Sequence, residues 1–116
     1  MSYSNVPLID QQVLSHLSEL LGFAEYRDLL GQTVIRLSDT ASRLGEPLEQ
    51  KDLRKLVHWI KGSLGTLGLA RLASIAAQIE ARCRQGTASD EDVPLLRDIM
   101  VDSHGALENL LNPPAP

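Results

Sequence analysis

The chain has 116 residues and a net charge of −4, with 43% hydrophobic and 22% charged residues. This length and composition suit one folded domain and exclude a disordered polar chain, and the acidic balance argues against nucleic acid as a partner. Because the sequence lacks a run of about 18 apolar residues, a signal-peptide pattern and a second cysteine, we expect a soluble cytoplasmic protein without disulfides.

The spacing of apolar residues predicts helices along the whole chain, beginning with a short one. Asp10 is placed to cap this helix and Gly22 ends it. Its apolar residues are Val13, Leu14, Leu17, Leu20 and Leu21. A second helix is predicted over about 23–44, closed by Gly45 and Pro47. Its apolar stripe consists of Phe23, Tyr26, Leu30, Val34, Leu37, Ala41 and Leu44.

The next two helices are predicted over about 48–67 and 69–85. Gly68, between them, is interpreted as structural, because it either ends the third helix or lets the two helices approach. Gly86 stops the fourth helix. The inward residues of the fourth helix are Leu69, Leu72, Ile75, Ala76, Ile79 and Cys83, with the cysteine packing as a small hydrophobe.

A fifth helix is predicted after Ser89, because Ser89 and Asp92 have the spacing of a capping box and Pro94 is tolerated in a first turn. Its stripe is Leu96, Ile99, Met100, Leu107 and Leu110. The proline-rich residues 112–116 predict a flexible tail. Four long amphipathic helices with short connections predict an all-α, antiparallel up-down four-helix bundle with a short extra N-terminal helix, a single domain over residues 1–111.

One segment departs from the acidic balance of the chain. Residues 51–71 hold five basic residues and one acid, so this segment carries +4 and the remainder of the chain −8. The residues are Lys51, Arg54, Lys55, Lys61 and Arg71, against Asp52. A basic island on an acidic protein favours a small anionic target, although an ordinary solvated helix face would have the same composition.

On a helical wheel of the third helix, His58 lies away from the apolar stripe. The stripe falls within about 60° of Leu53, whereas His58 falls at about 140°. The residues of the stripe are Leu53, Leu56, Val57, Ile60, Leu64 and Leu67. On the histidine side lie Lys51, Arg54, Gly62 and Gly65, with Lys61 one turn beyond His58. The wheel therefore predicts an exposed histidine among cations and glycines.

The glycines and cations on this face need a physical reason. A glycine inside a helix costs about 1 kcal/mol relative to alanine, and Gly62 and Gly65 would uncover the imidazole for a close approach. Like charges around a histidine repel one another. A dianionic phosphoryl group would turn this repulsion into charge-assisted hydrogen bonds, and Lys61 is the best placed to make them.

These residues carry a family resemblance. The segment His58-Trp59-Ile60-Lys61-Gly62-Ser63, followed by Gly65, Gly68-Leu69 and Leu72, resembles the His-x-x-Lys-Gly signature of histidine phosphotransfer (HPt) domains. Ile79-Glu80 fits the apolar-acid pair that often follows in the next helix of that family. The resemblance covers about residues 10–111, and its specific part is 57–80. Trp59 is bulkier than the small or polar residue usual at its position, and it would pack on a flank or touch the partner.

The resemblance implies a phosphoryl carrier rather than an enzyme. An Asp-phosphate on a receiver domain would pass its phosphoryl group to Nε2 of His58, and a second receiver would take it away, in a bacterial-type two-component phosphorelay. The receiver would supply Mg²⁺, so no bound cofactor or metal is expected. Lys61 would steady the phosphoryl oxygens and Gly62 would give clearance.

The expected partners are response-regulator receivers and hybrid sensor histidine kinases, with no nucleic acid and no membrane, and the chain itself is expected to be a monomer. We also assign Lys51, Arg54, Lys55 and Gly65 to phosphate or receiver binding. This assignment rests on the wheel and not on the resemblance. The chain would be a free-standing protein or a domain of a hybrid kinase.

The main alternative is a helical adaptor or inhibitor that binds a kinase or receiver without carrying phosphate. A zinc site is disfavoured, because the candidate ligands lie on different predicted helices without ligand spacing. They are His16, His58, His104 and Cys83. The glycine-rich residues 62–68 are not a P-loop, since the lysine precedes the glycines and no strand leads in. No serine or cysteine is paired with a base for nucleophilic hydrolysis.

Overall fold

The computed structural model of the chain describes residues 5–44 and 48–113, which contain helices and no strands. The helices are α1 (Gln11–Leu21), α2 (Phe23–Arg43), α3 (Gln50–Trp59), α4 (Ala70–Gln85) and α5 (Asp92–Leu111). Between α3 and α4 the helical path continues as a π-helical segment, η2 (Ile60–Leu64), and a 3-10 turn, η3 (Gly65–Leu67). The prediction of an all-α chain is confirmed.

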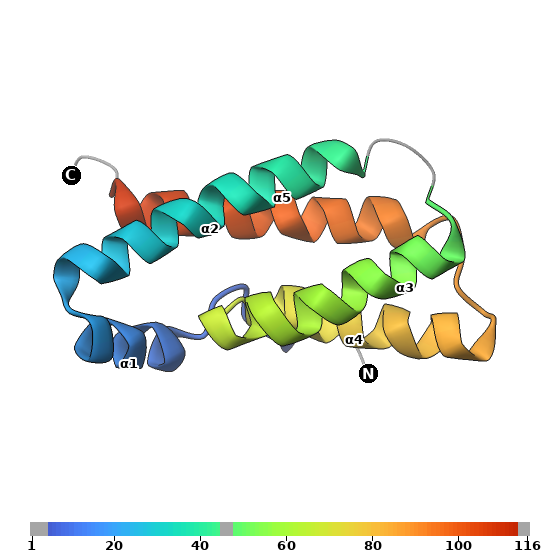
Figure 1. Cartoon of the computed structure of the whole chain (residues 1–116), viewed down its shortest axis with the longest axis horizontal. Coiled ribbons are helices and arrows are strands. Elements are labelled where there is room, and N and C mark those ends of the chain that lie inside the picture. The colour runs from blue at the N-terminus through green and yellow to red at the C-terminus, as the bar shows by residue number, and fades with distance from the viewer. Residues whose placement is uncertain (1–4, 45–47, 114–116) are drawn as a thin grey trace.

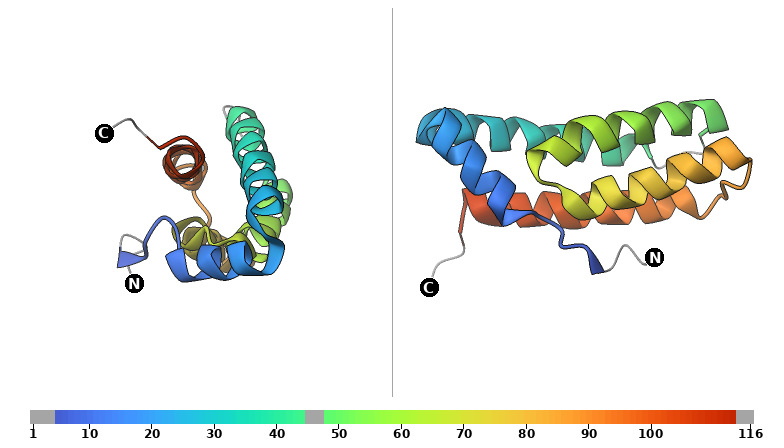
Figure 2. Two further views of the ribbon diagram at one scale, coloured as in Figure 1. Left: turned by 90° about the vertical axis from the view of Figure 1, so that its left-hand side faces the viewer. Right: turned by 90° about the horizontal axis from the view of Figure 1, so that it is seen from below.

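Helices α2 to α5 run up and down in turn, each antiparallel to the one before it (Figure 1). The end-on view in Figure 2 shows the four helices around a common centre, with α5 between α2 and α4. The short helix α1 crosses one end of the bundle, where it contacts α2 and η3. This arrangement confirms the predicted up-down four-helix bundle with an extra N-terminal helix.

Several helix boundaries lie where the predicted capping and helix-terminating residues place them. Oδ1 of Asp10 accepts hydrogen bonds from the amides of Gln12 (3.0 Å) and Val13 (3.3 Å) and so caps α1. Gly86 ends α4 with φ +72°, in the left-handed region that favours glycine. The predicted stops at residues 45 and 47, and residues 114–116 of the predicted tail, lie outside the described residues.

All five helices contribute buried aliphatic side chains to one core. The apolar side chains with 0% exposure are Val57, Ile60, Leu69, Leu72, Ala76, Ile79, Leu96 and Met100. Cys83 is half-buried and packs against this core, as predicted. The predicted stripes therefore face a common interior along most of their length.

At the ends of the bundle the predicted stripes are wrong. Phe23 is 74% exposed at the start of α2, and Leu110 is 39% exposed near the end of α5. Leu20 and Leu21, in the last turn of α1, are also exposed. Periodicity predicts the angle of a side chain around its helix axis. It does not predict whether a neighbouring helix extends far enough along the bundle to cover that side chain. Phe23 instead lies under the guanidinium of Arg27, which is 5.7 Å from the ring centroid.

One buried hydroxyl provides a stability prediction. Ser103 of α5 has 0% exposure, and its Oγ has no hydrogen-bond partner within the described residues. An unsatisfied buried polar group costs about 1–3 kcal/mol, so Ser103→Ala is expected to raise the free energy of unfolding by about 1 kcal/mol in urea titrations. The exposed Ser38→Ala on α2 controls for the higher helix propensity of alanine. A gain no larger than that of Ser38→Ala would contradict the prediction.

Candidate functional site

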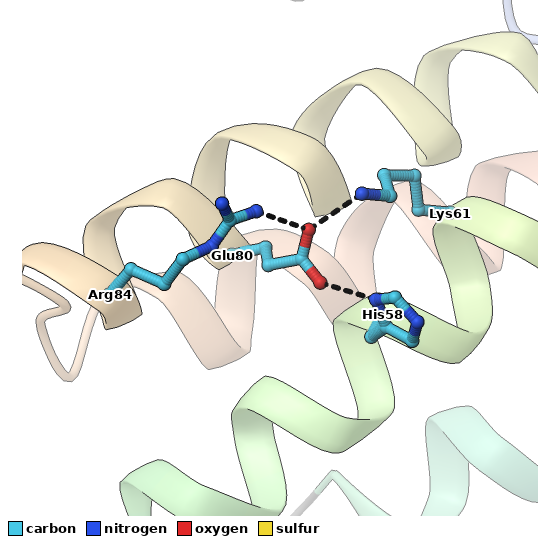
Figure 3. A network of polar contacts seen from close by, with 4 residues as sticks. All are labelled: His58, Lys61, Glu80 and Arg84. Carbon is cyan, nitrogen blue, oxygen red and sulfur yellow. Dashed lines mark hydrogen bonds and ion pairs between the residues drawn. The ribbon is translucent and has the colours of Figure 1, made fainter.

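His58 lies on α3 with 74% of its side chain exposed, on the side of the helix away from the core. The buried side chains of Leu53 and Val57 hold the opposite side of α3 in the bundle. The position predicted from the wheel is therefore confirmed. His58 is not free in solvent, because its Nδ1 lies 2.7 Å from Oε2 of Glu80 on α4 (Figure 3).

Glu80 is the centre of a polar network that joins α3 to α4. Only 5% of its side chain is exposed. Its Oε1 accepts hydrogen bonds from Nζ of Lys61 (2.7 Å) and from Nη2 of Arg84 (2.9 Å), while Oε2 faces His58. The hydrogen bonds from Lys61 and His58 outweigh the desolvation of the carboxyl and lower the pKa of Glu80 to about 2. The carboxylate is therefore ionised at neutral pH.

This network determines which ring nitrogen of His58 is reactive. An ionised carboxylate only accepts hydrogen bonds, so in the neutral ring Nδ1 must carry the hydrogen and donate it to Glu80. Nε2 then keeps its lone pair. Figure 3 shows this second nitrogen on the side of the ring away from Glu80. The arrangement gives an oriented and accessible nitrogen nucleophile.

The exposed side of His58 borders an open hollow of about 580 Å³. Its lining consists of His58, Glu80 and five cations, which are Lys51, Arg54, Lys55, Lys61 and Arg84. The single carboxylate in this lining is already bonded to two of the cations. Lys51 has one further ion pair, with Glu49 at 3.9 Å, and both side chains are about three-quarters exposed, so this pair is weak. The hollow therefore has an excess of positive charge beside Nε2 and suits an anion.

The two glycines predicted to flank His58 lie in different environments. Gly62 is exposed, and a Cβ built on it would meet nothing within 4 Å, so it leaves open space beside the site. A Cβ on Gly65 would lie 3.1 Å from Cβ of Ala73, so Gly65 packs against α4. The wheel placed Gly65 beside His58 because it assumed an α-helix throughout. The π-helical turn η2 takes more residues per turn and rotates Gly65 away from that face.

Gly62 and Gly65 should respond differently to substitution. Gly62→Ala is expected to raise the free energy of unfolding by about 0.5–1 kcal/mol, because alanine has the higher helix propensity and the space is open. Gly65→Ala is expected to lower it by about 1 kcal/mol, because the added methyl group is forced against Ala73. Thermal unfolding of the two variants would test this, and equal shifts would contradict the different placements.

Gly68 has the structural role predicted for it. Its φ is +87°, in the left-handed region, where it ends η3. A Cβ there would also meet the carbonyl oxygen of Asp10 at 3.3 Å. Gly68 therefore serves the contact between α1 and the bundle, and it is not part of the hollow.

Sequence reasoning missed the pairing of His58 with Glu80 and the role of Arg84. The one signal was the resemblance of Ile79-Glu80 to the family pair, which gives no partner for the acid.

Trp59 packs half-buried on a flank of α3, in a groove shared with α2. Within residues 5–44 and 48–113, no group of three or more His, Cys, Asp or Glu residues could hold a metal ion. No helix in the described part of the chain is long and apolar enough to cross a membrane.

Comparison with protein families agrees with this geometry. The family model for the Hpt domain matches residues 23–112. The chain belongs to the Hpt domain family. No curated protein and no solved structure matches it. Hpt domains are phosphocarrier modules of two-component signalling and interact with receiver domains and histidine kinases, so the family supports a phosphotransfer role for this chain.

Proposed function

We propose that Nε2 of His58 accepts a phosphoryl group from the Asp-phosphate of one receiver domain and passes it to another. The observation that carries the proposal is the hydrogen bond of 2.7 Å between Nδ1 of His58 and Glu80, which in the neutral ring leaves the lone pair of Nε2 free beside a basic hollow. The chain would act in the cytoplasm, as a monomeric carrier within a two-component phosphorelay. Its chemistry would depend on its receivers.

In the accepting step, the Nε2 lone pair of His58 forms a bond to phosphorus. The bond from phosphorus to the aspartyl oxygen breaks, and its electron pair stays on the carboxylate of the receiver. Mg²⁺ would come from the receiver. On this chain, Lys61 and Arg84 would supply positive charge to the phosphoryl oxygens, and the open space at Gly62 would admit the receiver.

The remaining cations of the hollow extend the site toward the start of α3. Lys51, Arg54 and Lys55 lie within two turns N-terminal to His58. One phosphoryl group cannot reach all of them, so we assign them to the receiver surface around its phosphorylated aspartate. Charges so placed favour encounter of the two proteins more than the chemical step.

The decisive experiment is phosphoryl transfer from a panel of receivers, each phosphorylated with acetyl phosphate, in the presence of Mg²⁺. The expected result is an acid-labile, base-stable label on the wild-type chain, located at His58 by mass spectrometry and absent from His58→Gln. His104→Gln on α5 is the matched control and should keep the label. Receivers that bind the chain but never label it would overturn the carrier and favour the adaptor.

A further inference from the structure

The basic hollow beside His58 is larger and more strongly charged than a single phosphoryl group requires. Its volume of about 580 Å³ lies in the range of small-molecule sites, about 300–1000 Å³. Five of the 11 basic residues of the chain line it, including all three lysines, and Glu80 is the one acid in the lining. With His58 neutral, the lining therefore carries +4 and the remainder of the chain −8. This concentration of positive charge suits an anion that carries several charges itself.

Four of the cations form a row along one face of α3 and its continuation into η2. Lys51, Arg54 and Lys55 precede His58 at steps of three or four residues, and Lys61 follows three residues after it. Residues at these steps are neighbours on a helix surface, and the row from Lys51 to Lys61 is about 15 Å long. One phosphate group cannot contact both ends of the row. A linear chain of phosphate groups can lie along it.

The cations of the hollow also have hydrogen-bond donors that are not in use. Lys61 and Arg84 each donate one hydrogen bond to Oε1 of Glu80 (Figure 3). An ammonium group has three donors and a guanidinium group has five, so both side chains can bind a second anion. Within residues 5–44 and 48–113, Arg54 and Lys55 make no ion pair. Lysine is a point charge on a flexible stem, which suits a ligand without a fixed planar shape.

We propose that the basic hollow binds a linear oligophosphate of three or more phosphate groups along the row from Lys51 to Lys61, and that the bound anion covers Nε2 of His58. Binding does not depend on the proposed function of His58, but its consequence does. The anion and a receiver would compete for the same cations, so the anion would inhibit phosphoryl transfer. A much longer polyanion would extend beyond the hollow, where the charge of −8 on the remainder of the chain repels it.

The first test is a titration of the ¹⁵N-labelled chain followed by NMR. Tripolyphosphate, pyrophosphate and orthophosphate are compared at constant ionic strength and about pH 8, where a terminal phosphate group has lost its second proton. Mg²⁺ is left out, because phosphate chains bind it. Tripolyphosphate should saturate at one equivalent, with shifts confined to the residues that line the hollow. It should bind at least about tenfold more tightly than orthophosphate, because each further phosphate group adds charge-assisted hydrogen bonds.

ATP distinguishes the two sources of such a phosphate chain. Binding as tight as that of tripolyphosphate would assign the hollow to the triphosphate group in general, including that of nucleotides. Much weaker binding would assign it to free oligophosphate. Both results are consistent with the proposed site, because the row of cations contacts only the phosphate chain.

A pair of double variants separates the hollow from the general charge of the chain. Lys51→Gln combined with Lys55→Gln should weaken tripolyphosphate binding by about tenfold, because two exposed cations of the row are lost. Arg36→Gln combined with Arg43→Gln is the matched control. It removes the same charge from exposed positions of α2 outside the hollow, and it should weaken binding by less than about twofold.

The second test asks whether the bound anion covers Nε2. Potassium phosphoramidate phosphorylates an accessible imidazole without a receiver and without Mg²⁺, and ³¹P NMR follows the product at His58. Tripolyphosphate at about ten times its Kd should slow this labelling by about tenfold, because it occupies about nine-tenths of the chains. Sodium chloride at the same ionic strength should slow it much less.

Equal affinities for orthophosphate and tripolyphosphate would overturn the inference, and so would equal weakening in the two double variants. Labelling of His58 that is unchanged at saturation would overturn the placement of the anion over Nε2. Tighter binding of an oligothymidylate of about ten nucleotides would show a nucleic-acid surface instead. Receivers that bind the chain but never label His58 would overturn the proposed function alone, because tripolyphosphate binding needs no receiver.

Discussion

Reversing the charges of Lys51, Arg54 and Lys55 to glutamate is expected to slow phosphoryl transfer from a receiver by about 10- to 100-fold at low ionic strength. These exposed side chains line the hollow beside His58, and within the described residues they make one ion pair, the weak one between Lys51 and Glu49. Their attraction for an acidic receiver surface acts before contact, so the loss should lie in association rather than in the chemical step. Transfer rates measured at several receiver concentrations would show this.

The matched control is charge reversal of Arg27, Arg36 and Arg43. These exposed cations lie on α2, outside the hollow, and their reversal changes the net charge by the same amount. This control should lose much less transfer. Raising the salt concentration should slow the wild-type chain and bring it toward the α3 variant, because screening removes the attraction. Equal losses in both variants, or transfer by the wild-type chain that does not depend on salt, would contradict the assignment.

Much of the fold follows from local signals that a single sequence contains. Asp10 and Gly86 act within their own helix ends, so their roles could be predicted without knowing the tertiary structure. The exposure of His58 followed from its angle relative to the core residues of α3. The hydrogen bond to Glu80 could not be predicted in this way, because it joins residues 22 positions apart on two helices. Its existence depends on how α3 and α4 pack.

Two wrong predictions, for Gly65 and Phe23, show what the spacing of apolar residues cannot predict. The wheel assumes 3.6 residues per turn, and the π-helical turn η2 breaks this assumption immediately after Trp59. Gly65 therefore lies against Ala73, although the count from His58 places it on the histidine face. Phe23 lies on the predicted apolar stripe, but it is the first residue of α2 and is 74% exposed. Neither a local π-helical turn nor the extent to which neighbouring helices cover one another can be read from the spacing of apolar residues in one helix.

Asp92 provides the largest expected effect on stability. It is 4% exposed, and its Oδ1 accepts from Nη2 of Arg82 at 2.5 Å. Its Oδ2 accepts from the amide of Ser89 at 3.0 Å, which is one half of the predicted capping box. Asp92 therefore ties the end of α4 to the start of α5. Asp92→Ala would leave a guanidinium and an amide without this partner, and breaking a buried pair costs about 3–5 kcal/mol.

Because the side chain of Arg82 is 34% exposed, water replaces part of the lost pairing, and we expect a loss of about 2–3 kcal/mol in the free energy of unfolding. Urea titration would measure it. Asp90→Ala, at an exposed neighbouring position, should change stability little. Similar losses in the two variants would contradict the role of the pair. At temperatures where Asp92→Ala stays folded, phosphoryl transfer from a receiver to His58 should be unchanged.

Asp92 and Glu80 are the buried carboxylates of the described residues, and we expect their substitution to have different effects. Asp92 caps a backbone amide at the turn between α4 and α5, so its loss weakens the fold. The three donors to Glu80 are side chains exposed by 74%, 40% and 57%, so water can replace the carboxylate for each of them. We therefore expect Glu80→Gln to stay folded, while His58 loses the charged acceptor for its Nδ1 hydrogen. If Glu80→Gln lowered the free energy of unfolding as much as Asp92→Ala does, the main role of the Glu80 network would be to stabilise the fold.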